Sequence, residues 1–493
     1  MPAARRSSPI MWQRLFKRFA GRSATLQGQV RDMVANAIMD GLLEPGAALP
    51  SSRVLADVLG VSRVTATLAL QHLCDGGLIE ARARRGYFVG QAAQPSRLTA
   101  ARPAVDDATA PSWRERLQMR PSEQRNIAKP HDWQQQPYPF IYGQFDATLF
   151  PLAAWRECAL ETLHVGAIRR WAPDHIEQDE ALLIEQIQQR LLPARGIWAR
   201  RDEILLTCGA QQATFMLATL LVDPETTVGI EDPGYPDARN NFALRTTRIV
   251  RLPVDGEGLV IGAALAGCRY VYVTPSHQCP TTVTMSLARR EALLAAAQQH
   301  DLVIVEDDHE SELAHDGQPT AALRSLDASG RVIYLGSLSK TLAHGLRIGY
   351  VVAPAALIAE LRALRRLILR HPPTNNAHTA ARFIAHGHHE AFVRRLNLAY
   401  RERARALRDA LARHAPALAG TPAHGGSALW VTAPPSLDTR ALAARALAEG
   451  IVIEPGDVFF GAARPPRHAM RLGYSSIPAE RIEAGVKRLA RLL

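Results

Sequence analysis

The chain has 493 residues, 47% of them hydrophobic, and its 58 lysines and arginines against 47 acidic residues give a formal net charge of +11. This length predicts two or three domains, and the hydrophobic content is ample for a large packed core. Because no run of about 18 uncharged apolar residues occurs, we expect no membrane span. Five scattered cysteines without a CxxC pair fit the cytosol and argue against a disulfide framework and a metal site.

The positive charge is concentrated in the first quarter of the chain. Residues 1–130 contain 19 lysines and arginines and 10 acidic residues, whereas the remaining residues contain 39 and 37. This asymmetry predicts a polyanionic partner for the N-terminal part. Residues 1–23 are basic but lack the long apolar core and cleavage site of a targeting peptide, so we expect a disordered or DNA-contacting tail there.

Residues 24–90 are expected to form a compact helical unit that ends in a short strand pair. Ser51 or Ser52 can cap one helix, Gly60 ends it, and Ser62 can cap the next. In the second helix, apolar residues recur at i, i+3, i+4 and i+7, which predicts one buried face. That buried face consists of Ala66, Ala69, Leu70 and Leu73.

Two short helices joined at a glycine are what a helix-turn-helix needs to enter a major groove. The following residues predict a hairpin with a basic tip, suited to phosphate or minor-groove contact. The alternative is a scaffold whose arginines are merely solvated, but the hairpin and the charge asymmetry favour binding to double-stranded promoter DNA. The predicted DNA-contacting residues are Arg53, Ser62, Arg63, Thr65, Thr67, Arg84, Arg85 and Gly86.

Residues 91–139 contain seven prolines and no sustained periodicity, which predicts an interdomain linker with a short helix near Trp113–Met119. From residue 140 to 493, short β-branched runs alternate with helical stretches, which predicts an α/β domain with a largely parallel sheet and a smaller α+β lobe after about residue 372. The strands of the large sheet are expected at Ile204–Thr207, Val228–Glu231, Tyr270–Thr274, Leu302–Glu306, Val332–Gly336 and Ile348–Val352. Those of the smaller lobe are expected around Ala428–Val431, Ile451–Ile453 and Met470–Gly473.

Lys340 is one of four lysines in a chain with 54 arginines. Arginine can replace lysine as a surface charge but not as a Schiff-base amine, because its guanidinium stays protonated. The residues 336–341, with Arg347 close behind, are typical of a pyridoxal-phosphate attachment site. We therefore predict that Lys340 is the reactive amine.

The other parts of a pyridoxal 5′-phosphate site occur in order along the chain. Gly209, Ala210 and Gln211 open a helix after a strand, where backbone N–H groups can hold a phosphate. Tyr235 offers a stacking ring, and Asp307 ends an apolar strand at the sheet edge where ligands bind. Each feature alone is more often turn chemistry or core packing, but the combination with Ser337, Ser339 and Arg347 predicts a cofactor site.

Residues 26–89 resemble the winged helix-turn-helix of GntR-type regulators, and residues 140–493 resemble fold-type I aminotransferases. The whole chain is similar to the MocR subfamily, which fuses the two. The resemblance implies that Lys340 attaches the cofactor, that Asp307 meets the pyridine nitrogen and that Tyr235 stacks on the ring. It also implies that Ser337, Ser339 and Arg347 bind phosphate, that Arg471 takes an effector carboxylate, and that the protein is a homodimer.

Several positions depart from the family pattern. His309 stands where the family usually has a tyrosine that contacts the cofactor, so we include His309 among the cofactor-binding residues. Thr282 replaces a usual glycine, His344 replaces a usual proline, and a common glycine and arginine are missing near residues 179–184.

These features predict a cytosolic transcription regulator that senses pyridoxal phosphate or a small amino compound. One alternative is a functional aminotransferase with an accessory DNA-binding domain, because Lys340 can also carry out proton transfers. Another is a regulator whose pocket has lost the cofactor, against which Asp307, Lys340 and Arg347 argue.

Overall fold

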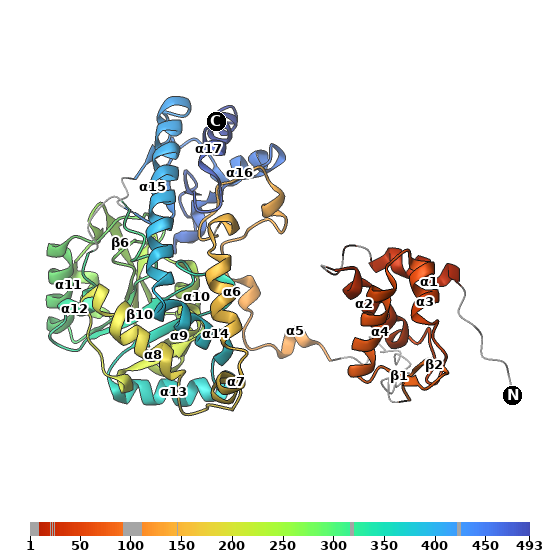
Figure 1. Ribbon diagram of the computed structural model, residues 1–493. Helices are drawn as coiled ribbons and strands as arrows, with labels where there is room; N and C mark the ends of the chain where they lie inside the picture. The colour runs from red at the N-terminus through yellow and green to blue at the C-terminus, as the bar shows by residue number, and fades with distance from the viewer. Residues whose placement is uncertain are drawn as a thin grey trace. The chain divides into compact units, whose positions relative to one another are not determined.

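The computed structural model describes residues 9–19, 21, 23, 25–91, 111–144, 146–315, 320–421 and 425–493. The chain divides into two compact units, Met1–Arg116 and Leu117–Leu493 (Figure 1). No helix of the described ranges is both long and apolar enough to cross a membrane.

The first unit is a helical bundle with a two-stranded wing. Its elements are α1 (Pro9–Phe19), α2 (Leu26–Met39), α3 (Ser52–Leu59), α4 (Arg63–Asp75), β1 (Ile79–Arg82) and β2 (Gly86–Val89). Ser51 caps α3 by accepting from the N–H of Val54, and Ser62 caps α4 by accepting from the N–H of Thr65 at 3.0 Å. Gly60 ends α3 in the left-handed conformation, with φ 67°. The four apolar residues predicted to face the core from α4 are all buried.

The expectation of a separate N-terminal tail is wrong for residues 9–19, which form α1 and pack on the bundle. Trp12 and Phe19 are 1% and 8% exposed, and Leu15 and Phe16 pack against the same core. These four residues recur at helical spacing, so burial of their side chains stabilises the helix. The basic residues between them masked this signal in the sequence.

The predicted linker is shorter than expected, because its C-terminal half belongs to the second unit. The guanidinium of Arg125 donates to the carbonyl oxygens of Phe460 and Ala462, both at 2.9 Å. Strand β3 (Tyr138–Pro139) pairs in parallel with β14 (Ile451–Val452). The short helix expected nearby is α5 (Trp113–Arg116), and residues 92–110 lie outside the described part.

The second unit contains an eight-stranded sheet in the order β4-β11-β10-β9-β8-β5-β6-β7. The five central strands from β10 to β6 are parallel, whereas β4, β11 and β7 pair antiparallel with their neighbours. The strands are β4 (Ile204–Thr207), β5 (Val228–Asp232), β6 (Ile249–Asp255), β7 (Gly258–Leu259), β8 (Tyr270–Val273), β9 (Val303–Asp307), β10 (Val332–Ser337) and β11 (Gly349–Val352). All six strands predicted for this sheet are present. Strand β6 was not expected, because its partly exposed residues lack a continuous apolar run.

A smaller four-stranded sheet, ordered β12-β13-β16-β15, forms the second lobe. Its strands are β12 (Ala419–Gly420), β13 (Ala428–Thr432), β15 (Glu454–Pro455) and β16 (Ala469–Gly473). The helices of the second unit are α6 (Leu152–Glu161), α7 (Val165–Trp171), α8 (Ala181–Gln186), α9 (Ala210–Leu221), α10 (Pro236–Ala243), α11 (Leu287–Gln299), α12 (Leu323–Leu326), α13 (Ala355–Leu369), α14 (Thr374–Ala385), α15 (His388–His414), α16 (Thr439–Ala448) and α17 (Ala479–Ala490). Helix α15 is the long blue helix that reaches the smaller lobe beside α17 (Figure 1).

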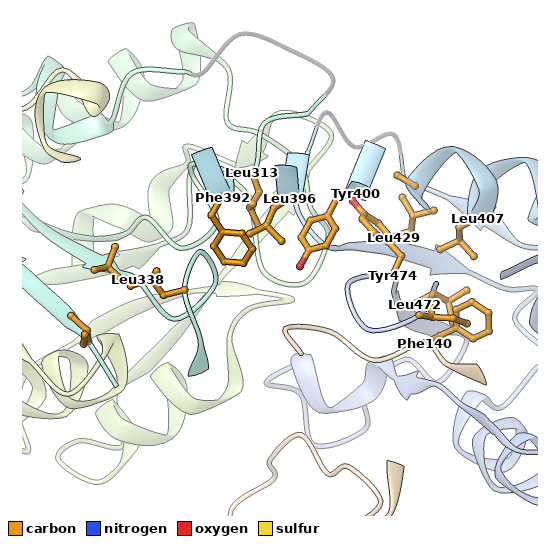
Figure 2. Packing of buried hydrophobic residues seen from close by; sticks show 14 of the residues in the cluster. Phe140, Leu313, Leu338, Phe392, Leu396, Tyr400, Leu407, Leu429, Leu472 and Tyr474 are labelled. Atoms are coloured by element: carbon orange, nitrogen blue, oxygen red, sulfur yellow. The ribbon is translucent and has the colours of Figure 1, made fainter. Parts of the chain in front are cut away.

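One hydrophobic cluster joins the two lobes and positions the loop after β10. Figure 2 shows a row of side chains from α15, including Phe392, Leu396 and Tyr400, between Leu338 and the strand residue Leu472. Leu338 is 2% exposed and precedes Lys340 by two residues. The packing of Leu338 therefore anchors the loop that carries the predicted reactive lysine.

Candidate functional site

A cavity of about 260 Å³ lies at the carboxyl ends of the parallel strands in the second unit. Its lining consists of Tyr142, Ala210, Gln211, Tyr235, Asp237, Cys279, Asp307, His309, Ser337, Ser339, Lys340, His344 and Arg347. Nine of the ten predicted cofactor-binding residues are in this lining, and the tenth, Gly209, immediately precedes Ala210. Tyr142, Asp237, Cys279 and His344 were not predicted to contribute, and of these the sequence analysis had noted only His344, as the replacement of a usual proline.

Lys340 lies on the loop that follows β10 and projects into the cavity. Its Nζ lies 3.1 Å from Nε2 of His344 and 4.1 Å from the centre of the Tyr142 ring. Burial lowers the pKa of Lys340 to about 8, and burial together with nearby cations lowers the pKa of His344 to about 3. A neutral His344 imidazole therefore accepts an N–H of Lys340, which orients an amine that loses its proton easily.

Asp307 ends β9 and is 4% exposed. The Tyr272 hydroxyl donates to its Oδ2 at 2.5 Å, whereas Oδ1 is buried and has no hydrogen-bond partner among the described residues. Nδ1 of His309 lies 3.8 Å from Oδ1. A buried carboxylate oxygen without a donor is unfavourable, and a protonated pyridine nitrogen supplies the missing donor. The Asp307 site therefore fits the ring of pyridoxal phosphate.

The features predicted to hold the phosphate converge at the start of α9. Gly209 caps this helix with φ 80°, and a Cβ at Gly209 would lie 2.8 Å from the Arg347 guanidinium. Arg347 donates to the carbonyl oxygen of Cys208 at 2.9 Å and forms no ion pair within the described ranges. The Ser339 hydroxyl is buried, and its oxygen likewise lacks a partner in the part of the chain described. An available guanidinium, an available hydroxyl and a helix N-terminus fit a phosphate group.

Tyr235 lies at the start of α10 with its ring against the cavity. Its hydroxyl donates to Oδ2 of Asp237 at 3.0 Å and lies 3.4 Å from Oε1 of Gln211. These contacts hold the ring in one place, as stacking on a flat cofactor requires.

Arg471, the residue predicted to take an effector carboxylate, does not line this cavity. Its Nε donates to Oε2 of Glu454 at 2.8 Å, and the guanidinium carbon lies 3.9 Å from the centre of the Tyr142 ring. One amino group, NH2, is buried and unpartnered in the described part of the chain. Arg471 and Lys340 therefore both contact the Tyr142 ring, and recognition of an effector carboxylate by Arg471 stays a prediction.

In the first unit, the predicted DNA-contacting residues lie on α3, at the start of α4 and on the wing. The arginines Arg53, Arg63, Arg84 and Arg85 are exposed and form no ion pair with other described residues. Ser62 and Thr65 are joined by a 2.8 Å hydrogen bond, and Thr67 is half-buried. Arg84 and Gly86 have positive φ values in the tight connection between β1 and β2. Exposed, unpaired guanidinium groups on a recognition helix and a wing suit binding to phosphates and base edges.

Comparison with known proteins agrees with both halves of this description. Residues 26–89 match the gntR family of bacterial regulatory proteins, and residues 153–489 match aminotransferase class I and II. The chain is 42% identical over 473 residues to the HTH-type transcriptional regulator TauR of Rhodobacter capsulatus, covering 96% of this chain and 97% of that protein. It is 30% identical to the probable rhizopine catabolism regulatory protein MocR of Rhizobium meliloti, covering 94% and 92%.

Among solved structures, the second unit is similar to LysN, an alpha-aminoadipate aminotransferase from Thermus thermophilus complexed with N-(5'-phosphopyridoxyl)-L-leucine. The TM-score is 0.70 at 29% identity, covering 78% of this chain and 98% of that chain. Aminotransferases of this fold depend on pyridoxal phosphate, which confirms the predicted cofactor at the level of the family. The chain belongs to the MocR subfamily of GntR-type transcriptional regulators, which fuse a DNA-binding winged helix-turn-helix to an aminotransferase-like domain.

Proposed function

We propose that this regulator binds pyridoxal phosphate through Lys340. In response to a small amino compound, or to the cofactor itself, it changes its affinity for promoter DNA. The observation that carries this proposal is that three polar groups able to bind the cofactor face one cavity. They are the amine of Lys340, Oδ1 of Asp307 and the Arg347 guanidinium. Pyridoxal phosphate supplies an aldehyde, a ring nitrogen and a phosphate that match these groups.

The cofactor-binding part is tested by adding pyridoxal phosphate to the purified protein. We expect a yellow complex, and borohydride reduction followed by peptide mass mapping should place a pyridoxyl group on Lys340. Lys129 and Lys487 serve as internal controls for non-specific labelling. A protein that stays colourless, or label spread evenly over the lysines, would refute covalent binding at Lys340.

The regulatory part is tested by footprinting on promoter DNA with and without the cofactor. We expect protected half-sites in direct or inverted repeat, with affinity that changes when cofactor or an amino compound is added. Amines and amino acids screened for a colour change in the loaded protein would identify the effector. A homodimer is proposed on the basis of the family resemblance, and sedimentation of the cofactor-loaded protein in an analytical ultracentrifuge tests it.

A functional aminotransferase is the second candidate, and the lowered pKa of Lys340 favours it. An amine that is partly neutral near physiological pH can both attach a carbonyl compound and move protons. Formation of keto acids from amino donors at ordinary enzymatic rates, without a DNA site in a selection experiment, would support this function over regulation.

A further inference from the structure

Lys129 is held inside the second unit, although it lies on the segment that leads from the DNA-binding unit. Its Nζ donates to the carbonyl oxygen of Tyr142 at 2.8 Å and lies 3.8 Å from Oε1 of Glu454. Burial lowers the pKa of Lys129, and its side chain is 26% exposed. A partly buried lysine in a chain otherwise rich in arginine is therefore placed for a specific contact.

Tyr142 connects this lysine to the cofactor cavity. Its ring centre lies 4.1 Å from Nζ of Lys340 and 3.9 Å from the guanidinium carbon of Arg471. Its backbone N–H donates to Oε2 of Glu454 at 3.3 Å, and Oε2 also accepts from Arg471. One residue thus contacts the reactive amine with its ring, and the Lys129–Glu454 pair with its backbone.

We propose that Lys129 couples occupancy of the cofactor cavity to the segment that leads to the DNA-binding unit, by way of Tyr142 and Glu454. The inference rests on the proposed function and specifies its ligand as an amine that carries a carboxylate. Such an occupant competes with Glu454 for the Arg471 guanidinium. The Glu454 carboxylate, freed from Arg471, then pairs more closely with Lys129.

The residues next to Lys129 can transmit the change in the Lys129–Glu454 ion pair along the segment. Arg125 is fixed to the carbonyl oxygens of Phe460 and Ala462, and the Asn240 amide donates to the Arg125 carbonyl oxygen at 3.1 Å. The segment is therefore held to the lobe by several contacts, of which the one at Lys129 depends on charge. Tightening or loosening this contact changes how firmly the end of the segment is held.

Hydrogen exchange on the full-length protein tests the coupling without DNA. The probes are N-(5'-phosphopyridoxyl)-L-leucine and the matched conjugate of 3-methylbutylamine, which has the same hydrocarbon chain but no carboxylate. We expect the leucine conjugate to slow exchange of residues 126–131 by at least about 3-fold relative to the amine conjugate. Equal exchange with the two conjugates would overturn the proposal.

Substitutions identify the residues that transmit the effect. Lys129→Gln should bind both conjugates and lose the difference between them, as should Glu454→Gln, whereas Lys487→Gln changes an exposed lysine of α17 and should keep it. Retention of the full difference in both Lys129→Gln and Glu454→Gln would contradict the coupling. If the wild type binds neither conjugate, the proposed cofactor site itself fails, an outcome separate from binding without coupling.

Discussion

The two units hold their positive charges in different ways. Arg63 on the recognition helix and Arg84 and Arg85 on the wing are exposed and form no ion pairs among the described residues. In the second unit, Lys340 and Arg471 instead lie against the Tyr142 ring, and Lys129 donates to the Tyr142 carbonyl oxygen. Exposed guanidinium groups suit a solvated polyanion, because each keeps its hydration until a phosphate arrives. Buried cations suit one small ligand of defined shape, because desolvation makes their interactions strong and sensitive to position. Substitutions in each unit can separate these two kinds of recognition.

The largest effect is expected for Lys340→Ala, which should abolish covalent attachment of the cofactor completely. Lys340→Arg should do the same while keeping the positive charge, because a guanidinium does not act as the attacking amine. DNA affinity of the cofactor-free protein should stay unchanged in both variants, measured by fluorescence anisotropy. Normal cofactor attachment in Lys340→Arg would show that another amine reacts.

A large effect is also expected for Gly143→Ala, because a Cβ at this position would collide with Nζ of Lys340 and the φ of 72° favours glycine. We expect strongly reduced cofactor attachment, measured by the yellow absorbance. Gly60→Ala is the matched control in the other unit, with φ 67° and no atom within 4 Å of the added Cβ. It should destabilise the first unit by only about 1 kcal/mol and leave cofactor attachment intact.

Arg63→Ala should weaken specific DNA binding by about 1–3 kcal/mol if the side chain contacts a base edge. Loss of a phosphate contact by Arg84→Ala should instead reduce the slope of log K against log salt concentration by about 0.9. Arg31→Ala, which removes an arginine paired with Asp32 on α2, is the matched control. Salt titrations of the three variants test whether helix and wing contribute differently, and identical behaviour would contradict this division.

A further effect concerns pH. Burial places the pKa of Lys340 at about 8 in the folded chain, against 10.5 for an ordinary lysine, so the unfolded chain binds more protons between these values. The cofactor-free protein should therefore gain stability as the pH rises from about 8 to 10.5, and the gain should be smaller in Lys340→Met. Denaturant titrations across this window measure it. Cofactor attachment should also accelerate as the pH rises through about 8, because the neutral amine reacts.

Local sequence signals predicted most elements of both units. The caps at Ser51 and Ser62 predicted where α3 and α4 begin, and the apolar periodicity of α4 predicted its buried face, because these signals act within one or two helical turns. The same kind of signal was present in α1, where basic residues between Trp12 and Phe19 led to the interpretation as a tail. Strand β6 was missed because its stability comes from pairing with β5 rather than from its own apolar pattern.

The sequence by itself determined the order of the two units, the lysine predicted to react and the chemical type of the cofactor site. These follow from motifs in which a few neighbouring residues carry the chemistry, as around Lys340. Only the tertiary structure decided that Lys340 and Arg471 both contact the Tyr142 ring, and that Lys129 and Glu454 meet at the Tyr142 backbone. These residues come from segments more than 100 positions apart, and strand order and lobe packing bring them together. Periodicity and motif spacing are local properties of the chain and therefore do not predict contacts between distant segments.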